Sequence, residues 1–240
     1  MRHDTIICLF DDSGNLFDDW REIGYTVVCV DIRPVEHRRQ GPGLVHIQAD
    51  LKESFPLPVA PERIAFVSAH PPCDHLAVSG SRWFKGKGLR LLADGIHMFA
   101  TAAEFCEASG APYTIENPVS TISTYWRKAD HVYSPWQYSG HDANDYYTKT
   151  TCLWVGGGFV MPEPLYDVAR YAKGAEQRKA VLAKHGRKRG ATAVQAEAPD
   201  YPDSRIFNTG GVLKAYFRSV TPKGFGRAVF LANCPEAAFA

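Results

Sequence analysis

The sequence predicts an α/β fold, in which a mainly parallel β-sheet is covered by helices on both faces. Apolar runs of strand length alternate with segments of helical period along the chain. Hydrophobic residues make up 45% and charged residues 22% of the sequence, as in an ordinary globular domain. Because 240 residues suffice for one sizeable core, we expect a single domain over residues 1–240.

The first half of the chain contains several predicted strands and one short helix. The run TIICLF at residues 5–10 is apolar and predicts a buried strand. A helix is expected at residues 15–24, because apolar side chains recur there at helical spacing and Gly24 can end it. These apolar side chains are Leu16, Phe17, Trp20 and Ile23. Further strands are predicted at residues 25–32, 44–51 and 63–69.

The next part of the chain begins with a long helix, which is expected at residues 88–110 and ends at another glycine. The segments PYTIENP, DHVYSPWQYSG and TTCLWVGG predict strands at residues 112–118, 130–140 and 150–157. A closing helix is expected at residues 221–233, with Thr221 as its N-cap and Pro222 in its first turn.

Residues 171–205 differ in composition from the rest of the chain. Aromatic residues are few there, apolar periodicity is lost, and the segment contains the basic run KHGRKRG. Because it lacks a helical or strand pattern, we interpret it as a basic insertion or mobile segment. The run is either a solvated loop or, if the protein handles nucleic acid, a place where Arg187, Lys188 and Arg189 contact phosphates without reading sequence.

Charge and cysteine usage exclude several classes of protein. The net charge of +1 favours no particular partner, although it can conceal a local basic face. The cysteines show no paired spacing, so neither a zinc ribbon nor a disulfide framework is predicted, and we expect no metal. They are Cys8, Cys29, Cys73, Cys106, Cys152 and Cys234.

The N-terminal sequence and the hydropathy pattern bear on location. The apolar run near the N-terminus is short and soon interrupted by acidic residues, which is not typical of a signal peptide. No stretch approaches membrane-spanning length. We therefore expect a cytoplasmic protein without a membrane partner, and we favour a monomer.

Polar loops follow several of the predicted strands. DDSGN follows the first strand, Asp31 the second, HPPC the fourth and ENP the fifth. In an open α/β sheet the carboxyl ends of the strands bind ligands, so these loops should converge. The small-residue turn around Gly14 and the carboxylate of Asp31 suit a nucleoside-containing cofactor, because the acid can bind ribose hydroxyls. The alternative is that Asp31 caps a helix.

Cys73 occupies an unusual position for a structural thiol. It follows two prolines, where the chain leaves a strand and has not begun a helix, and such loop positions commonly carry chemistry. A free thiol has a pKa of roughly 8.5, so a nucleophilic one needs nearby backbone N–H groups or a cation such as Arg82. An inert turn residue is the alternative. His70 and His75 also flank the thiol, which leaves a Cys–His hydrolase as a less favoured interpretation.

Three segments occur in a fixed order among the predicted strands and helices: HPPCDHLAVSGSRW, IENPVSTISTYWRKADHVYSPWQYSG and YTKTTCLWV. Through them the chain resembles the cytosine-C5 DNA methyltransferases, and most closely their compact, phage-associated branch. The resemblance runs from Ile6 to about Val155 and resumes at RSVTPKGFGRAV. It implies a Rossmann-like, S-adenosylmethionine-dependent methyltransferase fold that acts on a flipped-out cytosine in DNA. If the gene is carried by a phage, the location is the bacterial host cytoplasm.

The resemblance also implies catalytic roles. Cys73 would add to C6 of cytosine, because C5 is not nucleophilic enough to accept a methyl group until a nucleophile has added. Glu116, as a neutral acid, would donate to N3 and accept from the exocyclic amine, which requires a desolvated site. Asn117 would shape the turn or help to hold the base. Lys149 would contact the base or a phosphate, although a lysine at a strand edge is equally ordinary.

The resemblance places S-adenosylmethionine against the loops that follow the first four strands. The residues expected there are Phe10, Asp12, Ser13, Gly14, Asn15, Asp31, Ile32, Asp50, Leu51 and Pro72. DNA is the expected partner. Its contacts are expected from Ser79, Arg82, Lys85, Lys87, Arg187, Lys188 and Arg189.

Two departures from the family leave alternatives open. The family usually has glycine at the position of Asp12, whose carboxylate suits the ammonium of the cofactor but repels its carboxylate. The large recognition domain of longer family members is also absent. The alternatives are a thiolate enzyme that modifies free pyrimidine nucleotides or uses an altered cofactor, and a non-catalytic DNA-binding protein on a decayed methyltransferase fold.

Overall fold

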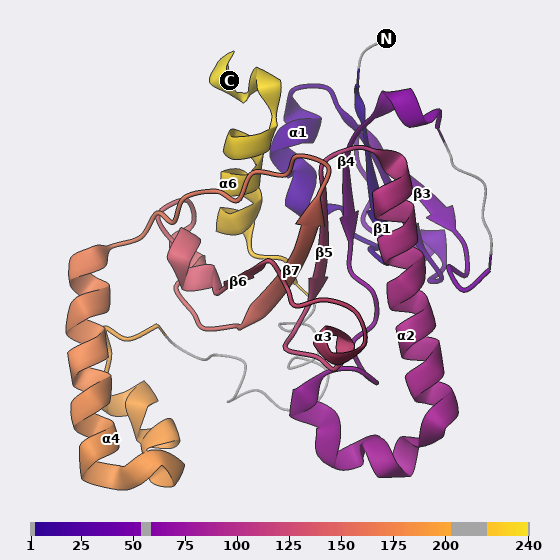
Figure 1. Ribbon diagram of the computed structural model, residues 1–240. Helices are drawn as coiled ribbons and strands as arrows, with labels where there is room; N and C mark the ends of the chain where they lie inside the picture. The colour runs from indigo at the N-terminus through magenta and orange to yellow at the C-terminus, as the bar shows by residue number, and fades with distance from the viewer. Residues whose placement is uncertain (1–2, 54–58, 203–219, 240) are drawn as a thin grey trace. The chain divides into compact units, whose positions relative to one another are not determined.

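The computed structural model describes residues 3–53, 59–202 and 220–239 (Figure 1). A seven-stranded sheet has the strand order β3-β2-β1-β4-β5-β7-β6. Its strands are β1 (Thr5–Leu9), β2 (Thr26–Asp31), β3 (Leu44–Gln48), β4 (Ile64–Ala69), β5 (Tyr113–Asn117), β6 (His131–Tyr133) and β7 (Thr151–Gly156). The neighbours from β3 to β5 pair in parallel, whereas β7 runs antiparallel to β5. The predicted α/β fold with a mainly parallel sheet is therefore confirmed.

Helices and single turns connect the strands. The α-helices are α1 (Asp18–Glu22), α2 (Phe84–Ser109), α3 (Ile122–Tyr125), α4 (Val168–Glu197) and α6 (Lys223–Asn233). The 3-10 turns are η1 (Asn15–Phe17), η2 (Val35–His37), η3 (Pro61–Arg63), η4 (Val78–Trp83), η5 (Pro135–Tyr138), η6 (Ala143–Asp145) and η8 (Pro235–Phe239). No helix among the described residues combines the length and apolar character needed to cross a membrane.

The chain divides into two compact units. The first comprises residues 1–132, 150–161 and 229–240, and the second comprises residues 133–149 and 162–228. The first unit contains β1–β5, β7 and the predicted loops of the site, and the second contains α4. The single domain expected over residues 1–240 stays a prediction.

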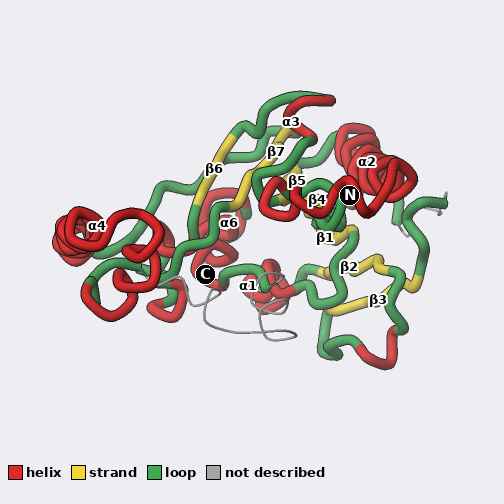
Figure 2. The backbone as a smooth tube through the Cα atoms, turned by 90° about the horizontal axis from the view of Figure 1, so that it is seen from below, coloured by secondary structure: helices red, strands yellow, loops and turns green. Residues whose placement is uncertain are grey.

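Apolar side chains cover both faces of the sheet in the first unit. On one face, Phe99 and Cys106 of α2 pack with Leu9 and Ile115 of the strands in the main buried cluster. On the other face, Trp20 of α1 lies against aromatic rings. Its ring neighbours are Phe17, Tyr25, Phe66 and Phe230. Figure 2 shows α2 and α1 on opposite sides of the central strands, so burial on both faces explains why these strands are apolar throughout.

Several boundaries differ from the prediction. The helix expected at residues 15–24 consists of η1 followed by α1, and the long helix begins earlier, at Phe84, with a break at Gly88, whose φ is +80°. The strand expected at residues 130–140 ends at Tyr133. Proline then starts the turn η5, in which the N–H of Ser134 donates to Gln137 Oε1 at 2.7 Å.

The N-cap predicted at Thr221 is wrong by one position. Helix α6 begins at Lys223, and the carbonyl of Pro222 accepts from the N–H of Gly226 at 3.1 Å. This bond makes Pro222 the N-cap, because the N-cap carbonyl accepts the first bond of a helix.

The prediction that residues 171–205 lack a helical pattern is wrong. Helix α4 extends to Glu197 and is capped by Asp167, whose Oδ1 accepts from the N–H of Arg170 at 2.9 Å. The segment is rich in alanine, lysine and arginine, which favour helices without an apolar stripe. Gly186, with a φ of +68°, breaks the helix immediately before the basic run.

Candidate active site

The loop after β1 is organised by a buried acid that sequence analysis did not select. Asp11 is 8% exposed, and its Oδ1 accepts from the N–H of Ser13 at 2.7 Å, the Ser13 hydroxyl at 2.8 Å and the N–H of Gly14 at 3.1 Å. Gly14 has a φ of +60°, and an added Cβ would lie 2.9 Å from Leu44 and 3.0 Å from the sulfur of Cys29. Only glycine fits this turn without displacing its neighbours.

Asp12, the residue that departs from the family, forms an ion pair with Arg33. Their oxygen and nitrogen atoms lie 2.6 Å apart, and Arg33 also binds Asp31 Oδ1 through its backbone N–H at 2.8 Å and through Nε at 3.2 Å. Burial raises the pKa of the Asp12 carboxyl, and the positive charge of Arg33 opposes that rise. Arg33 therefore neutralises part of an acidic patch at the ends of β1 and β2.

The remaining predicted cofactor residues lie on the same carboxyl edge, because they follow parallel neighbouring strands. Phe10 has a φ of +55° and donates its N–H to Val30 at 2.8 Å. Ile32 is 60% exposed just after β2, whereas Leu51 is 2% exposed and belongs to the core. The others are Asn15, which begins η1, Asp50, which precedes Leu51, and Pro72, which lies in the loop after β4.

The Pro-Pro-Cys loop is joined to the end of β5. Asn117 is 2% exposed, and its Nδ2 donates to the carbonyl of Pro71 at 2.9 Å. The carbonyl of Cys73 accepts from the N–H groups of Leu76 and Ala77 at 3.0 and 2.8 Å. A bridge between Ala77 and Ser120 continues the connection. Asn117 thus shapes the loop that carries Cys73, one of the two roles considered for it.

Glu116 contacts a histidine to which the resemblance gave no role. Its Oε2 lies 3.2 Å from His70 Nδ1, and His70 Nε2 lies 2.9 Å from the hydroxyl of Ser68. The Ser68 hydroxyl also lies 3.4 Å from that of Thr114. The loop that carries Cys73 is therefore connected to the end of β5, which carries Glu116 and Asn117, and His70 lies among them. The signal available in the sequence was the histidine directly before Pro-Pro-Cys.

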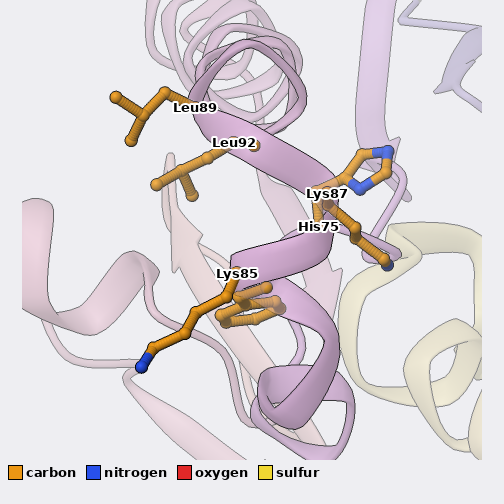
Figure 3. A pocket seen from close by; sticks show the side chains of 7 residues that line it. His75, Lys85, Lys87, Leu89 and Leu92 are labelled. Carbon is orange, nitrogen blue, oxygen red and sulfur yellow. The ribbon is translucent and has the colours of Figure 1, made fainter.

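The residues expected to contact DNA near the thiol lie on η4 and the first turn of α2. Ser79, Arg82 and Lys85 are exposed, and Lys87 Nζ donates to the carbonyl of Asp74. Lys85 and Lys87 also line a pocket of about 290 Å³. Figure 3 shows it with its lining residues His75, Phe84, Lys85, Lys87, Gly88, Leu89 and Leu92. The exposed cations on these turns can reach phosphates.

The other predicted basic contacts belong to the second unit. Lys149 Nζ donates to the carbonyl of Val220 at 3.2 Å. Arg187 is exposed and lies in the helical stretch that follows Gly186. Lys188 and Arg189 share that stretch, and their side chains lie outside the described part of the structure.

Two buried thiols lie beneath the first loop. Cys8 and Cys29 are register partners on β1 and β2, and their sulfur atoms and a carboxylate oxygen of Asp11 lie within 4.8 Å of one another. Burial raises the pKa of Cys8 well above its ordinary value. Asp11 Oδ1 accepts hydrogen bonds from the loop above the two thiols.

Comparison with known proteins adds no family assignment. No protein-family model matches the chain, and the search of curated proteins also gave no match. What the fold and the site define is an α/β protein with a thiol, a carboxyl group and an acidic loop at the carboxyl edge of its sheet.

Proposed function

We propose that this protein transfers a methyl group from S-adenosylmethionine to C5 of a cytosine in DNA. The observation that carries the proposal is the Asn117–Pro71 hydrogen bond, which joins the Cys73 loop to the strand end that bears Glu116. Addition to a cytosine ring requires a nucleophile and a base-binding carboxyl group close together, here on a loop and on the strand end joined to it.

The residues have defined roles in this reaction. The Cys73 thiolate forms a bond to C6 of cytosine while the proton of Glu116 moves to N3, which leaves C5 nucleophilic. S-adenosylmethionine supplies the methyl group that C5 accepts. Transfer of the C5 proton to solvent water, return of the N3 proton to Glu116 and cleavage of the S–C6 bond then restore the thiolate and an aromatic base.

The acidic loop fits the cofactor. Both Arg33 bonds end on Oδ1 of Asp31, so ribose hydroxyls would bind Oδ2. The left-handed turn at Gly14 lets the backbone approach a ligand closely. Arg33 compensates the charge of Asp12 and can attract the carboxylate of S-adenosylmethionine. It thereby offsets the repulsion expected between Asp12 and that carboxylate.

The direct test is mass spectrometry of nucleosides from duplex DNA incubated with the protein and S-adenosylmethionine. We expect 5-methyldeoxycytidine from the wild type and none from Cys73→Ser. Methylation of free cytidine nucleotides but not of DNA would favour the nucleotide-modifying alternative. DNA binding without any methylated product would favour the non-catalytic one.

The cofactor assignment gives a separate prediction. We expect Asp31→Ala to weaken S-adenosylmethionine binding by about 1.5–3 kcal/mol, because charge-assisted bonds to the ribose are lost. Asp12→Gly should leave the affinity unchanged or improve it, because it frees Arg33 for the cofactor carboxylate. Isothermal titration calorimetry measures both variants.

Asp4→Ala is the matched control for the calorimetry. Asp4 also pairs with an arginine, Arg63 at 2.8 Å, but it precedes β1 at the opposite edge of the sheet. Its replacement should not change the affinity. Loss of binding in Asp12→Gly would instead make Asp12 a cofactor ligand.

A further inference from the structure

Two thiols and a carboxylate meet beneath the loop that follows β1. The sulfur atoms of Cys8 and Cys29 and a carboxylate oxygen of Asp11 lie within 4.8 Å of one another. The two cysteines are register partners on the parallel strands β1 and β2, and both are 0% exposed. Among the described residues, no other three side chains of histidine, cysteine, aspartate or glutamate are arranged in this way. The cluster combines ligand types that the proposed methyl transfer does not use.

We propose that Cys8, Cys29 and Asp11 bind a thiophilic divalent cation, with Zn²⁺ as the best match. The inference goes beyond the proposed function and does not depend on it. Zn²⁺ binds cysteine sulfur at about 2.3 Å and carboxylate oxygen at about 2.0–2.2 Å. Three atoms that lie about 4 Å apart surround a point about 2.3 Å from each of them. A spacing within 4.8 Å therefore brings the three ligand atoms close to the distances that one shared ion needs.

The types of ligand favour this class of ion. Mg²⁺ and Ca²⁺ take oxygen ligands, so two sulfur atoms disfavour them. Cu⁺ prefers sulfur ligands alone, whereas Zn²⁺ accepts both thiolates and a carboxylate. Three protein ligands leave one of the four positions that Zn²⁺ usually fills, and water takes the fourth position in sites of this kind.

Binding requires deprotonated thiols, and the cation provides the driving force. When the two bonds from sulfur to the metal form, each S–H bond breaks and its proton passes to the buffer. The positive charge of a coordinated metal ion stabilises the thiolate, even at a buried position. The burial of Cys8 and Cys29 is therefore compatible with an ion that binds while the chain folds.

The loop holds Asp11 in a fixed orientation for this role. Its Oδ1 accepts from the N–H and the hydroxyl of Ser13 at 2.7 and 2.8 Å, and from the N–H of Gly14 at 3.1 Å. Carboxylates that bind metal ions are commonly oriented by such hydrogen bonds. The ion thereby joins β1 and β2 to the first loop, and we infer that it stabilises the fold at this edge of the sheet.

Protein produced in medium that contains Co²⁺ in place of Zn²⁺ tests the site, because the ion is then present while the chain folds. Co²⁺ bound to thiolates gives a sulfur-to-metal charge-transfer absorption. We expect about one Co²⁺ per chain with this absorption, and loss of both when Cys8→Ala and Cys29→Ala are combined. Cys106→Ala and Cys152→Ala remove other buried thiols and are the controls, which should keep the absorption. No absorption in the wild type, its survival in the double variant or its loss in Cys73→Ala would overturn the proposal.

Asp11→Asn keeps the test valid if the cysteine variants do not fold. The amide oxygen still accepts from the loop but is a weaker metal ligand, so we expect the Kd for Co²⁺ to rise at least about tenfold. Asp12→Asn changes the adjacent acid, which pairs with Arg33, and is the matched control. It should change the Kd less than about twofold. Equal Kd values for Asp11→Asn and the wild type would contradict the assignment of Asp11 as a ligand.

Thermal unfolding measures the stabilising role. An ion that binds only the folded chain raises its Tm, so a chelator should lower the Tm of the Zn²⁺-loaded wild type by about 5 °C or more. The chelator should not change the Tm of the double variant of Cys8 and Cys29. An equal Tm of the wild type with and without chelator would overturn the stabilising role. These measurements need neither DNA nor S-adenosylmethionine, so they decide the metal site whether or not the protein transfers methyl groups.

Discussion

Replacing Cys73 with alanine is expected to abolish methyl transfer, while the fold and the affinity for S-adenosylmethionine stay near those of the wild type. The thiol acts on the base, and its side chain is not part of the packed core. All six cysteines lie in the described residues, and Cys73 is the one that is not buried. A nucleophile must reach its substrate, so exposure favours this thiol over the others.

A duplex that contains 5-fluorocytosine measures this prediction directly. Fluorine at C5 blocks the final elimination, so the S–C6 bond persists and the protein becomes covalently attached to the DNA. The wild type should be trapped and Cys73→Ser should not. Trapping at Cys106 or Cys152 would contradict the assignment, and burial raises the pKa of both thiols, which makes them poorer nucleophiles.

Replacing Asp11 with alanine is expected to cost about 2–4 kcal/mol of folding free energy and to abolish cofactor binding. The substitution removes the acceptor for two backbone N–H groups and one hydroxyl, and buried donors without partners are expensive. The left-handed turn at Gly14 then loses the bonds that define it. Urea unfolding measures the stability, and calorimetry measures the binding.

Asp11→Asn is the matched variant, because its amide oxygen can replace Oδ1 as an acceptor. We expect it to retain most of the stability and measurable cofactor affinity. If Asp11→Ala unfolds at the same urea concentration as the wild type, the carboxylate does not organise the loop, and the interpretation of this site fails.

Much of the fold could be predicted because its determinants are local. Apolar runs such as TIICLF are continuous when a strand is buried on both faces, and every residue of β1 is buried. Helix α4 was not predicted, because the prediction relied on apolar periodicity. The helical state of α4 comes from residue propensity and from the cap at Asp167, and neither of these produces an apolar stripe.

The sequence by itself determined the sheet, the carboxyl-edge loops and the types of side chain on them, because alternation and turn residues act over a few positions. Only the tertiary structure decided which side chains meet. The pairing of β4 with β5 brings His70 to Glu116 and Asn117 to Pro71, and the pairing of β1 with β2 brings Arg33 to Asp12. These contacts join residues that are distant in sequence, and they form only when the strands pair side by side in the folded sheet.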